Sequence, residues 1–149
     1  MKGYASITLM AVFLLFACKD NPTEGNNAAA TYIEVAELVP AAGSMISASD
    51  TIAAILKYAI DNAVQSDYGF SISVKFTSVN EGQTFSIGQD TDISLTEKAG
   101  TITHTYPLDM IWNHADLKHP VSCYFYLHKE TSQTSSTVIA KTAEIKYTE

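Results

Sequence analysis

Apolar and polar residues alternate along most of the chain after residue 30, and this alternation predicts β-strands. In the segment 70–76 one face carries four apolar side chains, those of Phe70, Ile72, Val74 and Phe76. The opposite face carries Ser71, Ser73 and Lys75. A period of two with one apolar face is typical of a strand that is buried on one side of an antiparallel sheet. The segment 121–129 repeats the pattern, with its apolar residues at Val121, Cys123, Phe125 and Leu127.

Shorter or less regular alternation predicts six further strands, at residues 32–38, 51–60, 84–87, 93–96, 100–106 and 137–147. The segment 51–60 also contains alanine and leucine, which favour helices, but the turn residues around it indicate a strand. In the last segment the expected inner residues are Ile139, Ala143, Ile145 and Tyr147. About seven strands separated by regular turn signals predict an all-β antiparallel sandwich.

One segment, 107–120, departs from the strand period. Its apolar residues Leu108, Ile111, Trp112 and Ala115 follow the spacing of one helical face. We therefore expect a helix of one or two turns between two late strands, with its apolar face closing one end of the core.

The order of elements over residues 39–147 resembles that of bacterial immunoglobulin-like domains. The resemblance rests on Pro40 and Gly43 before the second strand, on the 70–76 strand, and on the closing pair of strands. It implies an immunoglobulin-like sandwich with the 61–69 and 131–136 loops at the end where the first strand begins. A transthyretin-like sandwich or a small barrel is the alternative.

The chain has two cysteines, Cys18 and Cys123. Cys18 lies in the amino-terminal segment before the predicted strands, so the disulfide that joins two strands in antibody domains is excluded. In the strand pattern, Cys123 lies on the apolar face. We expect it to behave as a small buried hydrophobe rather than as a nucleophile, which would need a nearby base and an electropositive setting.

The first eighteen residues follow the layout of a secretory signal peptide. Lys2 supplies a positive charge, a short apolar run ends at Phe16, and the small residue Ala17 precedes Cys18. A spanning helix would need about 20 apolar residues, so an uncleaved membrane helix is the weaker interpretation. An ordinary signal peptide followed by an incidental cysteine is a second alternative.

The sequence Leu15-Phe16-Ala17-Cys18 resembles a bacterial lipobox. The resemblance implies cleavage before Cys18, acylation of its thiol and its new amine, and a lipid-anchored protein of the cell envelope. Residues 1–17 would then be the leader, 18–30 the lipidated cysteine with a polar tether, and 31–149 the sandwich domain. Such a tether reaches roughly 20 Å as a flexible coil. By the same resemblance, Lys19 after the cysteine implies the outer membrane, and the pair Lys19-Asp20 resembles the start that some lipoproteins use for surface display.

Charge narrows the range of partners. The chain has a formal net charge of −7 and contains no arginine. This composition argues against nucleic acid, whose phosphates are neutralised by Lys and Arg, and against a basic patch for lipid headgroups. The expected partners are the membrane, through the lipid anchor alone, and envelope proteins or glycans.

Aromatic residues are the candidate ligand-binding residues. Trp112, Tyr124 and Tyr126, together with Tyr68, could form a platform for sugar rings, because aromatic faces bury large apolar area beside a polar edge. The alternative is that Tyr124 and Tyr126 are ordinary strand aromatics and that Trp112 closes the core.

The remaining chemistry is sparse. The four histidines, His104, His114, His119 and His128, lie close together in the sequence but lack the ligand spacing of zinc sites. The acidic pair Asp90 and Asp92 lacks the later ligands of a calcium loop. No catalytic motif or cofactor-binding signature is present. We expect a non-catalytic binding or structural domain, with a glycan-binding accessory lipoprotein of an uptake system as the alternative. A small metal-binding or hydrolytic protein that uses the histidines is a further alternative.

Overall fold

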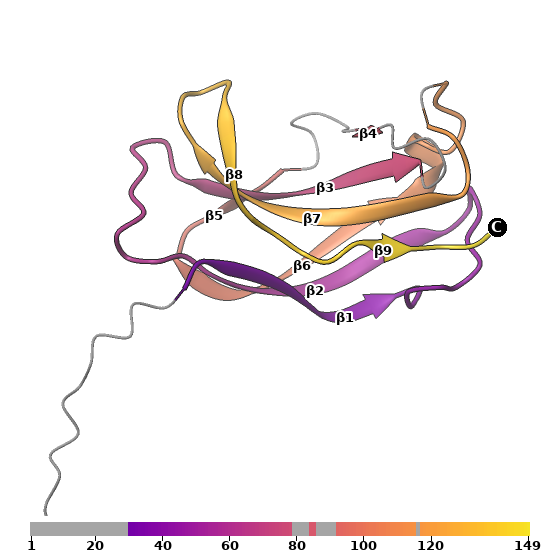
Figure 1. Cartoon of the computed structure of the whole chain (residues 1–149), viewed down its shortest axis with the longest axis horizontal. Helices are drawn as coiled ribbons and strands as arrows, with labels where there is room; N and C mark the ends of the chain where they lie inside the picture. Colours follow the sequence, from indigo (N-terminus) through magenta and orange to yellow (C-terminus); the bar gives the residue numbers. More distant parts are fainter. Residues whose placement is uncertain (1–29, 79–83, 86–91, 116) are drawn as a thin grey trace, which may run out of the picture.

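The computed structural model describes residues 30–78, 84–85, 92–115 and 117–149. These residues form two antiparallel sheets packed face to face, and neither sheet closes into a barrel (Figure 1). The all-β sandwich expected from the alternation is therefore confirmed. The expected leader, Cys18, most of the expected tether and Asp90 of the acidic pair lie outside the described residues. Within the described residues, no helix is both long and apolar enough to cross a bilayer.

The first sheet has three strands and the second has six. The three-stranded sheet has the order β1-β2-β6, with bounds Tyr32–Val39, Thr51–Ala59 and Ala99–Pro107. The six-stranded sheet has the order β4-β3-β7-β8, with bounds Thr84–Phe85, Phe70–Ser78, Val121–Glu130 and Ser136–Lys141. In addition, β5 pairs with β3 and β9 pairs with β7, with bounds Ile93–Leu95 and Ile145–Lys146.

This strand order is immunoglobulin-like. The strands β1, β2 and β6 take the places of A, B and E, and the strands β3, β7 and β8 take those of C, F and G. After β1 the chain crosses to the second sheet. There the Gly43 N–H donates to the Lys146 carbonyl at 2.7 Å, and Met45 forms a parallel bridge with Thr148. This crossing joins the two sheets along one side of the sandwich.

The alternation places the apolar faces of the strands between the sheets. From β3 and β7 the inner residues are those expected from the sequence, and the pairing of the two strands aligns Val74 with Phe125. Rings from opposite sheets meet in the core: Phe76 and Tyr106 have centroids 5.2 Å apart, and His104 and Phe125 have centroids 5.5 Å apart. The core therefore includes one histidine among its apolar side chains.

The short helix expected within 107–120 is confirmed at one turn, but its apolar face differs from the expected one. Only a three-residue 3₁₀-helix forms, η2 (Leu108–Met110), and turns follow it. Leu108 and Ile111 are buried as expected, but Ala115 is exposed, and Leu117 completes the closure of the core instead. The segment must pass from one sheet to the other, so its first turn packs on the core and the chain then turns away before a second turn can form.

The single closing strand expected over 137–147 is interrupted. Thr142 separates β8 from β9, and its N–H donates to the Phe125 carbonyl at 3.0 Å while its Oγ1 accepts from the Phe125 N–H at 3.1 Å. The threonine hydroxyl thus replaces a backbone acceptor, and the register shifts. As a result Ala143 is exposed rather than inner, whereas Ile145 and Tyr147 are buried as expected.

Hydrogen bonds between loops show which loops share one end of the sandwich. The Asp61 N–H donates to Thr31 Oγ1 at 3.0 Å, and the Glu130 N–H donates to the Gly69 carbonyl at 3.0 Å. The start of β1, the 61–69 loop and the 131–135 loop therefore share one end, here called the near end (Figure 1). The connections 40–50 and 107–120 lie at the far end. The loop placement implied by the resemblance is confirmed.

Candidate functional site

The outer face of β7 carries a row of ring side chains. Because alternate residues point outward, Tyr124, Tyr126 and His128 follow one another along the strand, with ring centroids 6.0 Å apart at each step. All three are half-buried. We call these three residues the aromatic ladder. The outward position of both tyrosines was expected from the alternation, but His128 was not singled out as their neighbour, although the same period contains it.

Two lysines lie against the aromatic ladder. Lys75 of β3 has its Nζ 5.7 Å from the centroid of the Tyr126 ring, and Lys141 of β8 has its Nζ 5.4 Å from that of Tyr124. Both distances fall within the range of cation–π attraction. The ladder is therefore fixed from both adjacent strands.

Serine hydroxyls hold the histidine of the ladder. His128 Nε2 lies 2.7 Å from Ser73 Oγ, and its Nδ1 lies 3.1 Å from Ser136 Oγ. Burial lowers the pKa of His128, and Lys75 lowers it further, against the opposing effect of Asp92 and Glu130. The ring is thus kept in its neutral form near pH 7.

The serine–histidine contact has the composition of a nucleophile and a base, but its setting is unlike that of an activated nucleophile. Ser73 is only 9% exposed, so a substrate would have little access to its hydroxyl. The second ring nitrogen faces the hydroxyl of Ser136, whereas a catalytic triad orients this nitrogen with a carboxylate. The arrangement holds the ring in place and suits binding better than catalysis.

A hollow of about 400 Å³ adjoins the near end of β7. This volume lies within the range of small-molecule sites. Its lining combines aromatic, hydroxyl, amide and carboxylate side chains with one apolar residue and one glycine: Tyr68, Gly69, Phe70, Ser71, Asp92, Ser94, Leu95, Glu130, Ser132 and Gln133. Ser71 Oγ donates to Glu130 Oε1 at 2.6 Å and so orients that carboxylate.

The walls of the hollow are cross-linked by Ser66. Its Oγ donates to the Glu130 carbonyl at 2.5 Å and accepts from the N–H groups of Tyr68 and Gly69 at 3.1 Å each. Gly69 has a φ of 94°, a left-handed conformation that glycine adopts without a steric penalty. One hydroxyl thus ties the loop before β3 to the end of β7.

The opposite wall is a compact hairpin loop. The N–H groups of Thr131 and Ser132 both donate to the Ser135 carbonyl, at 2.8 and 3.1 Å. The Thr134 N–H donates to Ser132 Oγ at 3.2 Å. These bonds hold Ser132 and Gln133 at the rim of the hollow.

The electrostatics of the hollow are acidic. Loss of hydration raises the pKa of Asp92, and the charge of Glu130 raises it further, whereas His128 and His104 act in the opposite direction. Two carboxylates that line the same hollow favour a ligand that brings hydrogen-bond donors or positive charge.

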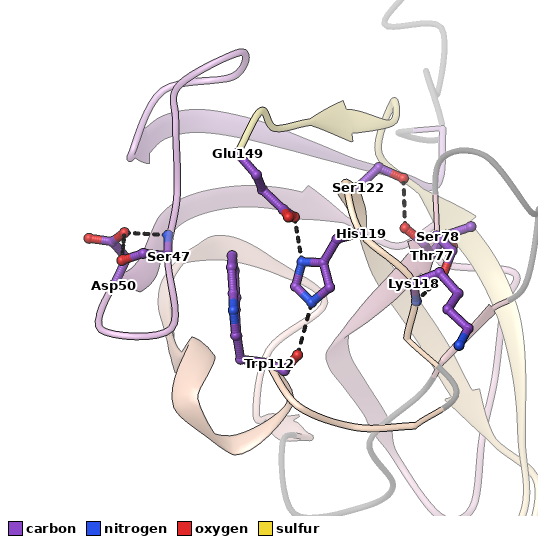
Figure 2. A network of polar contacts seen from close by, with 9 residues as sticks. All are labelled: Ser47, Asp50, Thr77, Ser78, Trp112, Lys118, His119, Ser122 and Glu149. Carbon is purple, nitrogen blue, oxygen red and sulfur yellow. Dashed lines mark hydrogen bonds and ion pairs between the residues drawn. The ribbon is translucent and has the colours of Figure 1, made fainter.

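The structure separates the predicted aromatic residues. Tyr68 lines the hollow, and Tyr124 and Tyr126 lie in the ladder on the same sheet. Trp112 lies at the far end, where its ring packs on His119 with centroids 4.4 Å apart (Figure 2). His119 Nε2 donates to the Trp112 carbonyl at 2.9 Å, and its Nδ1 lies 2.5 Å from Glu149 Oε1. Trp112 also packs against the core, as its alternative interpretation stated.

The four histidines have different surroundings. His104 is buried in the core, His119 bridges two segments of the far end, and His128 belongs to the aromatic ladder. His114 lies exposed in the turns after η2. In the part of the chain that the structure describes, no group of three or more His, Cys, Asp or Glu residues is placed to hold a metal ion.

Cys123 is a core residue, as expected. It is 0% exposed, and burial raises the pKa of its thiol to about 12. The thiolate needed for nucleophilic attack is therefore not formed near neutral pH.

Comparison with known protein families, with curated proteins and with solved structures finds no match to this chain. Its function must therefore be argued from its own residues.

Proposed function

We propose that this protein is a lipid-anchored protein of the cell envelope whose immunoglobulin-like sandwich is a non-catalytic binding domain. The observation that carries the proposal is the continuity of the aromatic ladder and the hollow on the outer face of the six-stranded sheet. We call this combined surface the ladder face. Half-buried rings, fixed lysines and an adjoining preorganised hollow are the components of a recognition surface.

The absence of catalysis is part of the proposal. Ser73 is nearly buried and its histidine faces a second serine, and the buried Cys123 thiol has a pKa of about 12. Neither group has the accessibility that an activated nucleophile needs.

The lipid anchor is supported by the leader pattern that ends at Cys18. Mass spectrometry of the protein from its native membrane tests it: the amino-terminal peptide is expected to begin at Cys18 and to carry fatty acyl groups. The variant Cys18→Ala is expected to leave the membrane fraction. An unmodified thiol at this position in membrane-derived protein would contradict the anchor.

The ladder face is tested by photo-crosslinking in intact cells. A benzoyl-phenylalanine at position 126 is expected to capture a binding partner, because this residue is at the centre of the ladder. The matched control is the same probe at Tyr32, which is 42% exposed on the other sheet. Equal capture from both positions would contradict a specific binding face.

A second candidate function, a glycan-binding accessory lipoprotein of a surface uptake system, is favoured by the chemistry of the hollow. Its aromatic side chains, carboxylates and hydroxyls match the apolar faces and hydroxyl groups of sugars. The two candidates differ in the crosslinked material, which would be a protein in the first case and a glycan in the second.

A further inference from the structure

We propose that the hollow binds a single sugar ring, either neutral or bearing an amino group, and that the rest of the glycan extends along the aromatic ladder. This inference rests on the proposed function of the ladder face and specifies its ligand. It excludes acidic sugars from the hollow.

The apolar contact for the ring is Tyr68. Its side chain is 56% exposed although it lines the hollow. A large aromatic surface left open to water beside polar groups suits the C–H face of a pyranose, because stacking there removes apolar area from water on both partners. The neighbouring Phe70 ring has Lys98 Nζ 6.0 Å from its centroid, so Tyr68 is the more open of the two rings.

Hydrogen-bonding groups line the same hollow as Tyr68. Glu130 and Asp92 are acceptors when ionised, whereas the hydroxyls of Ser94 and Ser132 and the amide of Gln133 can both donate and accept. Sugar hydroxyls also donate and accept, so a mixed lining matches them. A ligand with a single ammonium group would use the carboxylates and leave the hydroxyls and the amide without a role.

The preorganisation of the hollow supports a built site rather than a chance depression. The Glu130 carboxylate is held by Ser71, and its backbone carbonyl is held by Ser66. Groups that are already oriented lose little conformational freedom when a ligand binds. Ser66 also accepts a hydrogen bond from the Tyr68 N–H, so one residue joins the aromatic and the acidic sides of the hollow.

Charge decides which sugars fit. The carboxylates of Asp92 and Glu130 both line the hollow. Burial raises the pKa of Asp92, and the negative charge of Glu130 adds to that rise. A uronic acid would add a third negative charge to the same volume, whereas an amino sugar would relieve the repulsion. The two lysines of the ladder lie against tyrosine rings and do not line the hollow.

The ladder gives the ligand its direction. From Glu130 to Tyr124 the outer face of β7 covers six residues, which is roughly 20 Å along a strand. An extended oligosaccharide could therefore place its terminal ring in the hollow and stack later rings on Tyr126 and Tyr124. Binding is expected to strengthen with chain length.

The test is calorimetric titration of the protein purified without its leader, with Cys18 replaced by serine. The probes are glucose, galactose, mannose, N-acetylglucosamine, glucosamine, glucuronate, galacturonate and tetramethylammonium. We expect at least one neutral or amino sugar to bind and neither uronate to do so. We expect Tyr68→Ala to weaken the best sugar about tenfold and Tyr32→Ala to leave it unchanged. Glu130→Gln is expected to weaken the amino sugar more than the neutral one. Urea unfolding of each variant establishes that it is folded.

Three results with the protein that carries no further substitution would overturn the inference: no sugar binds, a uronate binds as well as the neutral sugars, or tetramethylammonium competes with the best sugar. Equal losses in Tyr68→Ala and Tyr32→Ala would overturn it as well. The proposed function is judged separately, by the crosslink at position 126. If a protein is captured there and no sugar binds in the titrations, the proposed binding face is supported and only the sugar ligand is contradicted.

Discussion

On the inner face of β7 four side chains are 0% exposed, those of Val121, Cys123, Phe125 and Leu127. On its outer face Tyr124, Tyr126 and His128 remain half-buried, and each has a polar or charged neighbour. The two faces alternate residue by residue along the same strand. The inner face serves to pack the core. The outer face carries large rings at a surface where smaller polar residues would be sufficient for folding.

The outer face of the other sheet sharpens this contrast. There β6 presents Thr101, Thr103 and Thr105, and β2 presents Ala53 and Ile55. Threonine and isoleucine satisfy β propensity, and these central positions of β2 and β6 hold no row of rings. The exposed Tyr32 of this sheet lies at the start of the edge strand β1. A sandwich of this size thus does not need an aromatic outer face for stability, which is why we assign recognition to the ladder face.

The largest expected effect separates the two faces of β7. Phe125→Ala should lower the free energy of unfolding by about 3–5 kcal/mol, because it removes a fully buried ring and leaves a cavity. Urea unfolding followed by circular dichroism measures it. The matched variant Tyr126→Ala on the outer face should lower the free energy of unfolding by clearly less. Similar losses in the two variants would show that the ladder is part of the structural core.

A smaller loss of stability is expected on the inner face when a substitution changes the polarity of a side chain rather than its volume. Cys123→Ser should cost about 1–3 kcal/mol, since it buries a hydroxyl among apolar side chains. Cys123→Ala, which removes the sulfur without adding a polar group, is the control in the same urea measurement. In folded protein carrying Cys18→Ser, iodoacetamide should not modify Cys123, because the thiol is buried and its pKa is about 12. Rapid alkylation of the folded protein would contradict the burial.

The near end of the outer face is predicted to depend on Ser66. Ser66→Ala removes three hydrogen bonds and should lower stability by about 1–2 kcal/mol. It should also speed amide hydrogen exchange at Tyr68 and Gly69. Ser132→Ala, at the opposite rim, affects a bond within the hairpin loop and should leave exchange at those two amides unchanged. If both variants change it equally, Ser66 is not the tie between the walls.

The smallest effect concerns pH. Burial lowers the pKa of His128 below its ordinary value of 6.5 in the folded state, so below that pH the unfolded chain binds the proton more readily. Stability contributed by the neutral ring is therefore present above pH 6.5 and is lost as the pH falls toward the lowered folded pKa. Urea midpoints at about pH 7.5 and pH 5.5 should differ more for the natural protein than for His128→Asn. An identical difference would place His128 in a fully hydrated setting.

Local features of the sequence predict much of the fold. Strand period is a property of neighbouring residues, so β3 and β7 were located from alternation alone. The predictions failed where the conformation of a residue is decided by a contact with a residue distant in the sequence. Thr142 interrupts the last strand because its hydroxyl bonds to Phe125. Ala115 is exposed rather than on the apolar face of the short helix, because η2 ends at Met110 and the chain then crosses between the sheets.

The candidate site divides in the same way. The sequence alone determined that Tyr124 and Tyr126 face outward and that Cys123 faces inward, since each depends on adjacent residues. The proposed lipobox at residues 15–18 also rests on adjacent residues alone. Only the tertiary structure decided that Tyr68, Asp92 and Glu130 line one hollow and that Trp112 lies at the other end of the sandwich. The physical reason is that the hollow is enclosed by segments from three separate parts of the chain. Their meeting depends on sheet pairing and on the Ser66 bonds, which no local period encodes.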